Sequence, residues 1–334
     1  MGIAVMTKSP TVVAGLILVT GFLLGTCQSH PLTGQTPTSA QGLFTFVFDD
    51  GFETDFSIVR PIFMERGLRA GIAIITGWVG RPGVDTVDEI RQLRDDGFEI
   101  MSHTVTHPHL PRLTDEQIEY ELAKSQADLA SWGVPVDSLV YPYNQNNQKV
   151  RAIAAKHYRY ARAGQRQLNY DLSNPYSLFS HPFERDLGRQ EDLVDQAAKQ
   201  NAWIFFYHHR MEASIRFDDK QGQFLEGEPI RFEKSGLKGQ FFDNGPVFFG
   251  RSVVYGPMTD GNPIQGEKVI GLKSGASCLV RDVEFNDRDR LEQLLDYVRR
   301  QWPNMKMVLP KDGFRLMADR PTHAASVPNS DQPE

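Results

Sequence analysis

The chain has 334 residues and a formal net charge of −6, with 40% hydrophobic and 23% charged residues. This length accommodates one large α/β domain together with a leader and an insertion, and the composition is that of an ordinary globular protein. The net negative charge, and the lack of any basic run longer than two residues, argue against a nucleic-acid-binding protein.

The first residues predict an export signal. Lys8 precedes an apolar run, Thr11 to Gly25, that is short for a membrane span and typical of the hydrophobic part of a signal peptide. The run ends in Leu24-Gly25-Thr26-Cys27, which resembles a bacterial lipoprotein cleavage box, although Thr26 stands where Gly, Ala or Ser is usual. We expect a leader at residues 1–27 and a flexible tether, rich in Ser, Thr, Pro and Gly, at residues 28–41. The expected location is periplasmic or at the cell surface, with a lipid on Cys27 as membrane anchor; a plain secretory signal and an uncleaved anchor are the alternatives.

From residue 43 onward, short apolar runs alternate with amphipathic segments. Thr114 and Gln117, for example, form a capping box that predicts the start of a helix. Such alternation implies parallel strands joined by right-handed crossovers, as in an incomplete barrel. No internal repeat is visible. The predicted strands cover residues 43–48, 70–76, 98–101, 138–141, 158–161, 202–207 and 305–309, and the predicted helices cover residues 57–66, 87–96, 114–132, 147–157, 191–200 and 287–301.

Residues 210 to about 276 break this alternation and predict a β-rich insertion. The segment is rich in Gly and Phe, and short runs such as Ser252-Val253-Val254-Tyr255 have the pattern of strands between turns. Cys278 follows, at what we expect to be a buried strand position; a disulfide with Cys27 is an alternative. We expect the folded domain to cover residues 42–315 and the polar tail, residues 316–334, to be disordered.

Two short polar strings follow two of the predicted strands. Asp49, Asp50 and Gly51 come directly after strand 43–48, and His103 and His107 follow strand 98–101. Taken alone, the first string is typical of a solvated turn and the second of surface or core histidines. In barrels, however, catalytic residues gather at the C-terminal ends of parallel strands, and one carboxylate with two histidines leaves open positions on a divalent metal. The sequence therefore predicts a catalytic metal site with a second carboxylate beside it that takes a proton from water.

These strings and two later ones resemble the signature motifs of the polysaccharide deacetylase family, also called the NodB-homology family or carbohydrate esterase family 4. The third string departs from the family pattern, which often has an Arg before the Pro-Tyr. The resemblance covers roughly residues 43–209 and 279–309 and implies a distorted (β/α)7 barrel, here with the β-rich insertion near the C-terminus. The four strings are Phe48-Asp49-Asp50-Gly51, His103-Thr104-Val105-Thr106-His107, Leu139-Val140-Tyr141-Pro142-Tyr143 and Trp203-Ile204-Phe205-Phe206-Tyr207-His208-His209.

The resemblance implies roles for five residues of the first three strings. Asp50, His103 and His107 would bind a divalent metal, with zinc expected. Asp49 would act as the general base toward water. The backbone N–H of Tyr143 would contact the developing oxyanion.

The acid that protonates the leaving amine is expected to be one of two neighbouring histidines. His209 lies six residues after Trp203, as in the family pattern. Alternate residues of a strand face opposite sides, so only one of the pair points inward; we predict His209, with His208 as the alternative. In the family's fourth motif an Arg and an Asp orient the base, and Arg162 is the best candidate for that Arg.

The resemblance predicts a metal-dependent hydrolase that removes N-acetyl groups from an exported polysaccharide of the N-acetylglucosamine type. The same chemistry serves an O-acetyl esterase or a small-amide C–N hydrolase, and a non-catalytic carbohydrate-binding protein is the alternative outside enzymes. Aromatic residues of the insertion would stack on sugar rings, or else Phe241, Phe242, Phe248 and Phe249 form the core of the insertion itself. The expected partners are the polysaccharide and, through Cys27, the membrane.

Overall fold

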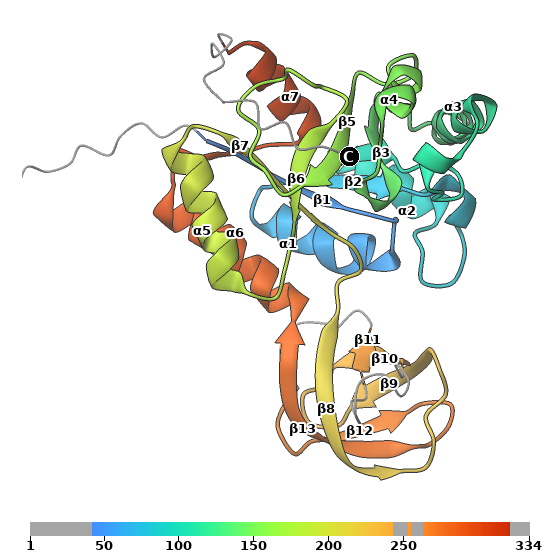
Figure 1. Ribbon diagram of the computed structural model, residues 1–334. Helices are drawn as coiled ribbons and strands as arrows, with labels where there is room; N and C mark the ends of the chain where they lie inside the picture. The colour runs from blue at the N-terminus through green and yellow to red at the C-terminus, as the bar shows by residue number, and fades with distance from the viewer. Residues whose placement is uncertain (1–41, 243–252, 256–262, 321–334) are drawn as a thin grey trace, which may run out of the picture. The chain divides into compact units, whose positions relative to one another are not determined.

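The computed structural model describes residues 42–242, 253–255 and 263–320 (Figure 1). The predicted leader with Cys27, the whole of the predicted tether and the chain after Arg320 lie outside these residues. Within the part that is described, none of the helices combines the length and the apolar character that a membrane span requires.

Seven parallel strands close into a barrel (Figure 1). They pair in chain order, and β7 returns to pair with β1 over six residue pairs, from Leu43 with Trp203 to Phe48 with His208. A short eighth strand, β14 (Lys306–Met307), also pairs with β1. The predicted (β/α)7 barrel is thus confirmed. The barrel strands are β1 (Leu43–Phe48), β2 (Gly71–Ile74), β3 (Glu99–Ser102), β4 (Ser138–Val140), β5 (Tyr160–Gln165), β6 (Leu178–Pro182) and β7 (Trp203–His208).

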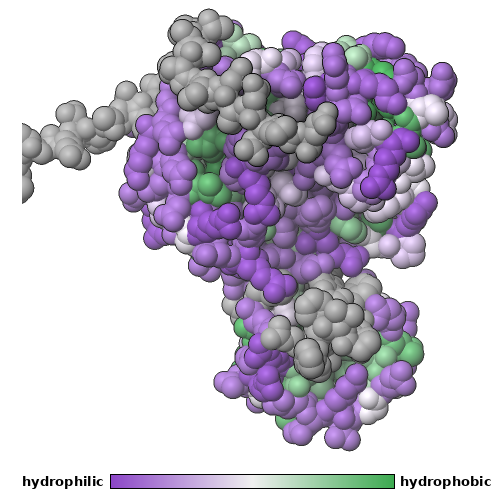
Figure 2. Space-filling view, viewed as in Figure 1, coloured by the Kyte–Doolittle hydropathy of each residue, from purple (hydrophilic) through white to green (hydrophobic). Residues whose placement is uncertain are grey.

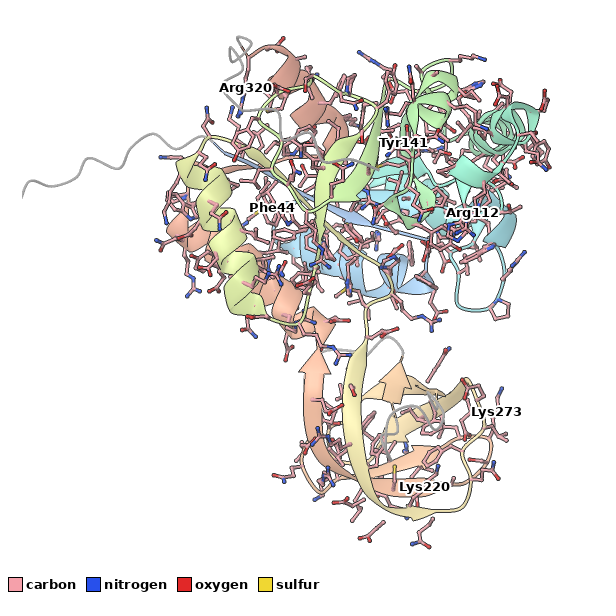
Figure 3. The ribbon with its side chains drawn as sticks, in the orientation of Figure 1. Phe44, Arg112, Tyr141, Lys220, Lys273 and Arg320 are labelled. Carbon is pink, nitrogen blue, oxygen red and sulfur yellow. The ribbon has the colours of Figure 1, made fainter. Side chains whose placement is uncertain are left out.

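Each barrel strand has one face toward the interior and one toward the surrounding helices. Val47, Tyr160 and Phe205 belong to an interior cluster to which every one of the seven strands contributes. Phe44 and Phe46 lie on the other face and pack in the cluster that includes the buried residues of the helices; Figure 3 labels Phe44 among the barrel strands. Side chains alternate along a strand, so the first residue after β1, Asp49, and the first residue after β7, His209, are expected to face the barrel interior.

The helices match the predictions closely. The predicted helix at residues 57–66 begins as a π-helical turn, Asp55–Val59, and continues as α1. The capping box of Thr114 and Gln117 is formed at the start of α3. The α-helices are α1 (Arg60–Glu65), α2 (Val87–Asp95), α3 (Asp115–Ser131), α4 (Gln148–Ala154), α5 (Leu187–Lys199), α6 (Asp287–Gln301) and α7 (Pro310–Ala318).

Two elements were not predicted, β6 and α7. Strand β6 contains a histidine and a proline and shows no clear alternation. Helix α7 contains Gly313, a poor helix former. That glycine is needed because a Cβ atom there would lie 2.3 Å from the buried ring of Trp203. The prediction that disorder begins at residue 316 is therefore wrong for residues 316–318, because packing of α7 against the barrel holds them.

The insertion is a six-stranded antiparallel sheet with the order β11-β10-β9-β12-β13-β8. Its predicted end at residue 276 is wrong, because β13 runs on to Asn286 and leads directly into α6. The strands are β8 (Ala213–Gln221), β9 (Glu228–Phe232), β10 (Lys238–Phe242), β11 (Val253–Tyr255), β12 (Lys268–Gly271) and β13 (Ser277–Asn286).

The insertion has its own hydrophobic core. Phe224 and Phe241 stack in it with their ring centroids 4.5 Å apart, so Phe241 has the core role rather than a sugar-stacking one. Phe248 and Phe249 lie outside the described residues. Cys278 is a buried free thiol in β13, as predicted, and burial raises its pKa to about 12, so it is not a nucleophile.

The structure also reveals an internal repeat that the sequence analysis did not find. Residues 227–236 and 266–275 share the pattern Gly-Glu-x-(Ile/Val)-x-x-x-Lys-Ser-Gly. Glu228 accepts hydrogen bonds from the backbone of Lys273 and Ser274, and Glu267 accepts the same bonds from Lys234 and Ser235. Each glutamate thus fixes the turn of the other copy, a reciprocal arrangement that joins β9 to β12. Figure 3 labels Lys273 in one of these turns.

The exposed surface is largely hydrophilic on the face that Figure 2 displays. Among the described residues, the large hydrophobic side chains that remain exposed come from separate parts of the chain: Tyr120, Tyr143, Tyr170, Leu225, Ile264 and Leu272.

Candidate active site

The turn after β1 points two adjacent carboxylates in opposite directions. Asp49 continues the alternation of β1 and faces the barrel interior, where it is 3% exposed. Asp50 has φ 77° and Gly51 has φ 70°, so the chain leaves the strand through a left-handed turn. Such a conformation is costly for a residue other than glycine and is concentrated at functional sites. The turn brings the Asp50 carboxylate over the end of β3.

Two histidines approach Asp50 from the loop after β3. Nε2 of His103 lies 3.4 Å and Nε2 of His107 lies 3.6 Å from Oδ1 of Asp50. The ligand atoms of the three residues all lie within 4.8 Å of one another. Nδ1 of His103 is 2.7 Å from the carbonyl oxygen of Val140, to which its N–H donates, so its Nε2 carries the lone pair.

The loop between the histidines is held by Glu121, a buried residue of α3. Its carboxylate accepts hydrogen bonds from the backbone N–H groups of Val105 (2.8 Å) and Thr106 (2.9 Å) and from the Thr106 hydroxyl (2.6 Å). The loop also contains two left-handed residues, Thr104 with φ 68° and His107 with φ 61°. Glu121 offsets the cost of this backbone conformation and fixes the direction of His107. The sequence analysis missed Glu121, although a charged residue on the buried stripe of α3 was a usable signal.

The charges within the cluster suit a metal ion. Burial lowers the pKa of His107 to about 4, and the neighbouring His103 adds to the effect, so the His107 imidazole is uncharged at neutral pH. Burial by itself would raise the pKa of Asp50, but His103, His209 and His107 outweigh it and the net pKa is lowered. Oδ1 of Asp50 is buried and makes no hydrogen bond. An anionic oxygen without a donor and two neutral imidazoles fit a divalent ion such as zinc.

The second carboxylate, Asp49, is held by a buried arginine. Nη2 of Arg162, which is fully buried in β5, donates to Oδ2 of Asp49 over 2.6 Å, while Oδ1 of Asp49 has no hydrogen-bond partner. The guanidinium also donates to the Ser180 hydroxyl and lies 4.5 Å from the centre of the Tyr207 ring. Arg162 therefore occupies the position expected of the residue that orients the base.

The two histidines at the end of β7 have different surroundings. His208 lies on the outer face, where Phe183 packs against its ring and its Nε2 is 3.1 Å from Oδ2 of the buried Asp287. His209 follows Tyr207 on the interior face and is close enough for its charge to act on the ligand cluster. The sequence analysis did not find Asp287, whose pairing with His208 spans the whole insertion.

An aromatic group lies beside the histidine cluster. Tyr143 has φ 55°, and its ring centroid is 4.5 Å from that of His107 and 3.9 Å from that of His109. The Tyr143 side chain remains 51% exposed. His109, for which a structural or surface role was expected, stacks on this ring and contacts Oε1 of Gln145 through Nδ1. A solvent-exposed stack of the Tyr143 and His109 rings thus lies beside the histidine cluster.

Residues 37–161 match the sequence profile of the family described as Polysaccharide deacetylase. This part of the chain resembles that family in sequence. It contains the Asp49-Asp50 turn, His103, His107 and Tyr143, so the resemblance inferred from the motifs is confirmed. The expectation of an enzyme of this family is confirmed with it.

The chain is similar to two curated proteins. It is 30% identical over 166 residues to a gellan lyase of Bacillus sp, covering 48% of this chain and 6% of that protein. It is 26% identical over 110 residues to YxkH of Bacillus subtilis (strain 168), a proposed polysaccharide deacetylase, covering 33% of this chain and 39% of that protein. The chain therefore spans less than half the length of either relative. Among solved structures, the Xyl-CE4 domain of a multidomain xylanase from the hindgut metagenome of Trinervitermes trinervoides aligns over 83% of this chain and 91% of that domain, with 16% identity and a TM-score of 0.44.

Replacing Arg162 tests how strongly the buried ion pair stabilises the fold. Arg162→Met leaves the Asp49 carboxylate buried without its partner, and we expect the free energy of unfolding at pH 7 to fall by about 3–5 kcal/mol. Adding Asp49→Asn to this variant should restore part of the loss. Arg159→Met, which removes an exposed pair with Asp137, should cost less than about 1 kcal/mol. Urea denaturation measures all three; equal losses for Arg162→Met and Arg159→Met would contradict the prediction.

Proposed function

We propose that this protein removes N-acetyl groups from a polysaccharide of the N-acetylglucosamine type outside the cytoplasm, with a divalent ion, zinc, held by Asp50, His103 and His107. The observation that carries the proposal is that the two carboxylates at the turn after β1 have different partners. Asp50 faces two imidazoles, and Asp49 beside it faces a buried arginine and keeps one oxygen without a partner. A hydrolase needs both a ligand and a base at such a site.

In the proposed reaction, Asp49 takes a proton from the attacking water. Its free Oδ1 is the acceptor, and Arg162 holds the other oxygen and thereby the plane of the carboxylate. The ion, when bound, would polarise the acetyl carbonyl and lower the pKa of a water molecule. The backbone N–H of Tyr143 would donate to the oxygen of the carbonyl as it becomes negative. The water oxygen forms a bond to the carbonyl carbon.

The second half of the reaction breaks the C–N bond. The amine nitrogen needs a proton to leave, and His209 on the interior face is the proposed donor. His208 is the alternative, but it faces away from the ligand cluster and is engaged by Asp287. The products are acetate and a free amine on the sugar.

Other acyl groups remain alternatives for this site. An O-acetyl ester or a small amide would undergo the same attack, since both have a carbonyl carbon bonded to a leaving heteroatom. A carbohydrate-binding protein without activity is disfavoured, because binding alone does not require a base carboxylate held by a buried arginine.

Substitution of the proposed ligands separates metal binding from the chemical step. His103→Ala and His107→Ala should each lose the bound divalent ion and the activity, and Asp50→Asn should weaken metal binding. Asp49→Asn should keep the metal and lose rate by a factor on the order of 10²–10⁴, the usual contribution of a positioned base. His157→Ala, whose ring contacts Glu119, is the control and should change neither property. Metal analysis that found one equivalent in both histidine variants would exclude this ligand set.

Replacing His208, the last residue of β7, and replacing His209, which follows it, should have opposite effects. His209→Ala should lower kcat by a factor on the order of 10²–10⁴ with metal content unchanged, because it removes the proton donor. His208→Ala should reduce stability more than kcat, because it removes one of the two donors to Oδ2 of the buried Asp287 and leaves only the N–H of Glu212. The measurements are steady-state kinetics and urea denaturation of both variants. The reverse pattern would assign the acid to His208.

Acetate release from oligomers of N-acetylglucosamine tests the substrate class. Each sugar ring that stacks on an aromatic side chain would contribute roughly 1 kcal/mol, about a fivefold change in affinity, so activity should rise with chain length and be negligible on the monosaccharide. Replacing residues 214–285 with a short glycine linker should raise KM for long oligomers and leave metal content intact. The paired ends Ala213 and Asn286 make this excision short. Equal turnover of the monosaccharide, or of a small amide, and a hexamer would exclude the polymer.

We further propose that a lipid on Cys27 anchors the protein outside the cytoplasmic membrane. The support is the sequence of the leader and its cysteine alone. Cys27→Ser should move the protein from the membrane fraction to a soluble fraction in the producing cell. Retention of this variant in the membrane fraction would favour an uncleaved leader as the anchor.

A further inference from the structure

Two fully buried aspartates outside the metal cluster have no hydrogen-bond partner. Asp55 and Asp85 each have 0% exposed surface, and none of their four carboxylate oxygens accepts a hydrogen bond. A buried carboxylate without a partner costs several kcal/mol unless a proton or a cation neutralises it. Neither residue belongs to the proposed reaction.

Outside the histidine cluster, the other buried carboxylates that the structure describes accept hydrogen bonds. Glu99 accepts bonds from Ser138, Tyr160 and the backbone of Lys311. Three further buried glutamates likewise accept three or more hydrogen bonds each: Glu121, Glu228 and Glu267. Asp55 and Asp85 are exceptions that need a different partner.

The backbone holds the two aspartates close together. Phe52 and Val84 form an antiparallel bridge, the N–H of Asp85 donates to the carbonyl of Gly51 over 2.9 Å, and the N–H of Glu53 donates to that of Gly83 over 3.1 Å. The turn after β1 and the loop before α2 are thus paired side by side, and each brings one unpartnered carboxylate to the pairing.

The charges that act on this pair are negative. Burial raises the pKa of Asp85 to about 9, and the charges of Glu89 and Glu53 add to the rise. Burial also raises the pKa of Asp55, and Asp85, Asp50 and Asp49 add to it. A single shared proton would leave a net negative charge among these neighbours, whereas a divalent cation would neutralise both carboxylates.

We propose that Asp55 and Asp85 bind a second cation, a hard divalent ion such as Ca²⁺, separate from the ion at the histidine cluster. Hard ions prefer sites built from oxygen alone, and the two carboxylates provide four oxygens that accept no hydrogen bond. The ion ties the turn that contains Asp49 and Asp50 to the loop before α2. It therefore positions the catalytic turn without touching substrate.

Calcium binding to the zinc-loaded protein tests the second site. We expect equilibrium dialysis with CaCl₂ at pH 7 to find one calcium per chain in addition to zinc. Asp55→Asn and Asp85→Asn should each weaken calcium binding by at least about tenfold, since affinity follows the ligand charge, and leave zinc content unchanged. Asp88→Asn, in the exposed first turn of α2, is the matched control and should bind calcium normally. His103→Ala should lose zinc and keep calcium, which separates this proposal from the one for the histidine cluster.

The wild-type protein decides the question even where an aspartate variant does not fold. Calcium should raise the Tm of the zinc-loaded wild type and of Asp88→Asn by several degrees, because it binds the folded state. The proposal is overturned if calcium, magnesium and manganese all leave the Tm unchanged. It is also overturned if calcium binds Asp55→Asn and Asp85→Asn as tightly as wild type, or if both variants are more stable than wild type without responding to calcium, which would assign a shared proton to the pair.

Discussion

The site depends on the opposite directions of two neighbouring carboxylates. Along a strand, adjacent side chains already face opposite sides, and the left-handed conformation of Asp50 turns the chain out of the sheet at that point. Asp49 can then contact Arg162 inside the barrel while Asp50 contacts His103 and His107 at its edge. The strain of the turn is of order 1–3 kcal/mol, and the partners on both sides hold it in place.

Closure of the barrel through the pairing of β1 with β7 also fixes the directions of the other side chains of the site. Strand β1 is buried on both faces and pairs with β7 over its whole length, so its register is specified by the core on each side. A slip of one residue would exchange the interior and exterior positions and bury Phe48 where Asp49 now contacts Arg162. The same register places His209 on the interior face and His208 against Asp287.

Buried glutamates and aspartates organise loops throughout the molecule. Glu121 holds the histidine loop by accepting backbone hydrogen bonds, and Glu228 and Glu267 do the same for the turns of the insertion. Such bonds fix irregular backbone without apolar packing, because an anionic acceptor strengthens each bond. Asp55 and Asp85 occupy an equivalent place between two loops, and a bound cation would complete them in the same way.

The sequence by itself determined the parallel barrel, nearly all of its helices and the two aspartates and two histidines of the site, because period, capping and motif order are local signals. It did not determine β6 or α7, whose sequences are locally ambiguous, nor the end of the insertion at Asn286, which follows from long-range pairing of β13 with β8. The family resemblance named Arg162 as a candidate, and the tertiary structure showed that it reaches Asp49. Only the tertiary structure showed that Asp287 engages His208 across the insertion and that two short repeats fix each other. These partners lie far apart in the chain. A local sequence pattern does not indicate which of the buried charged residues will be in contact after folding.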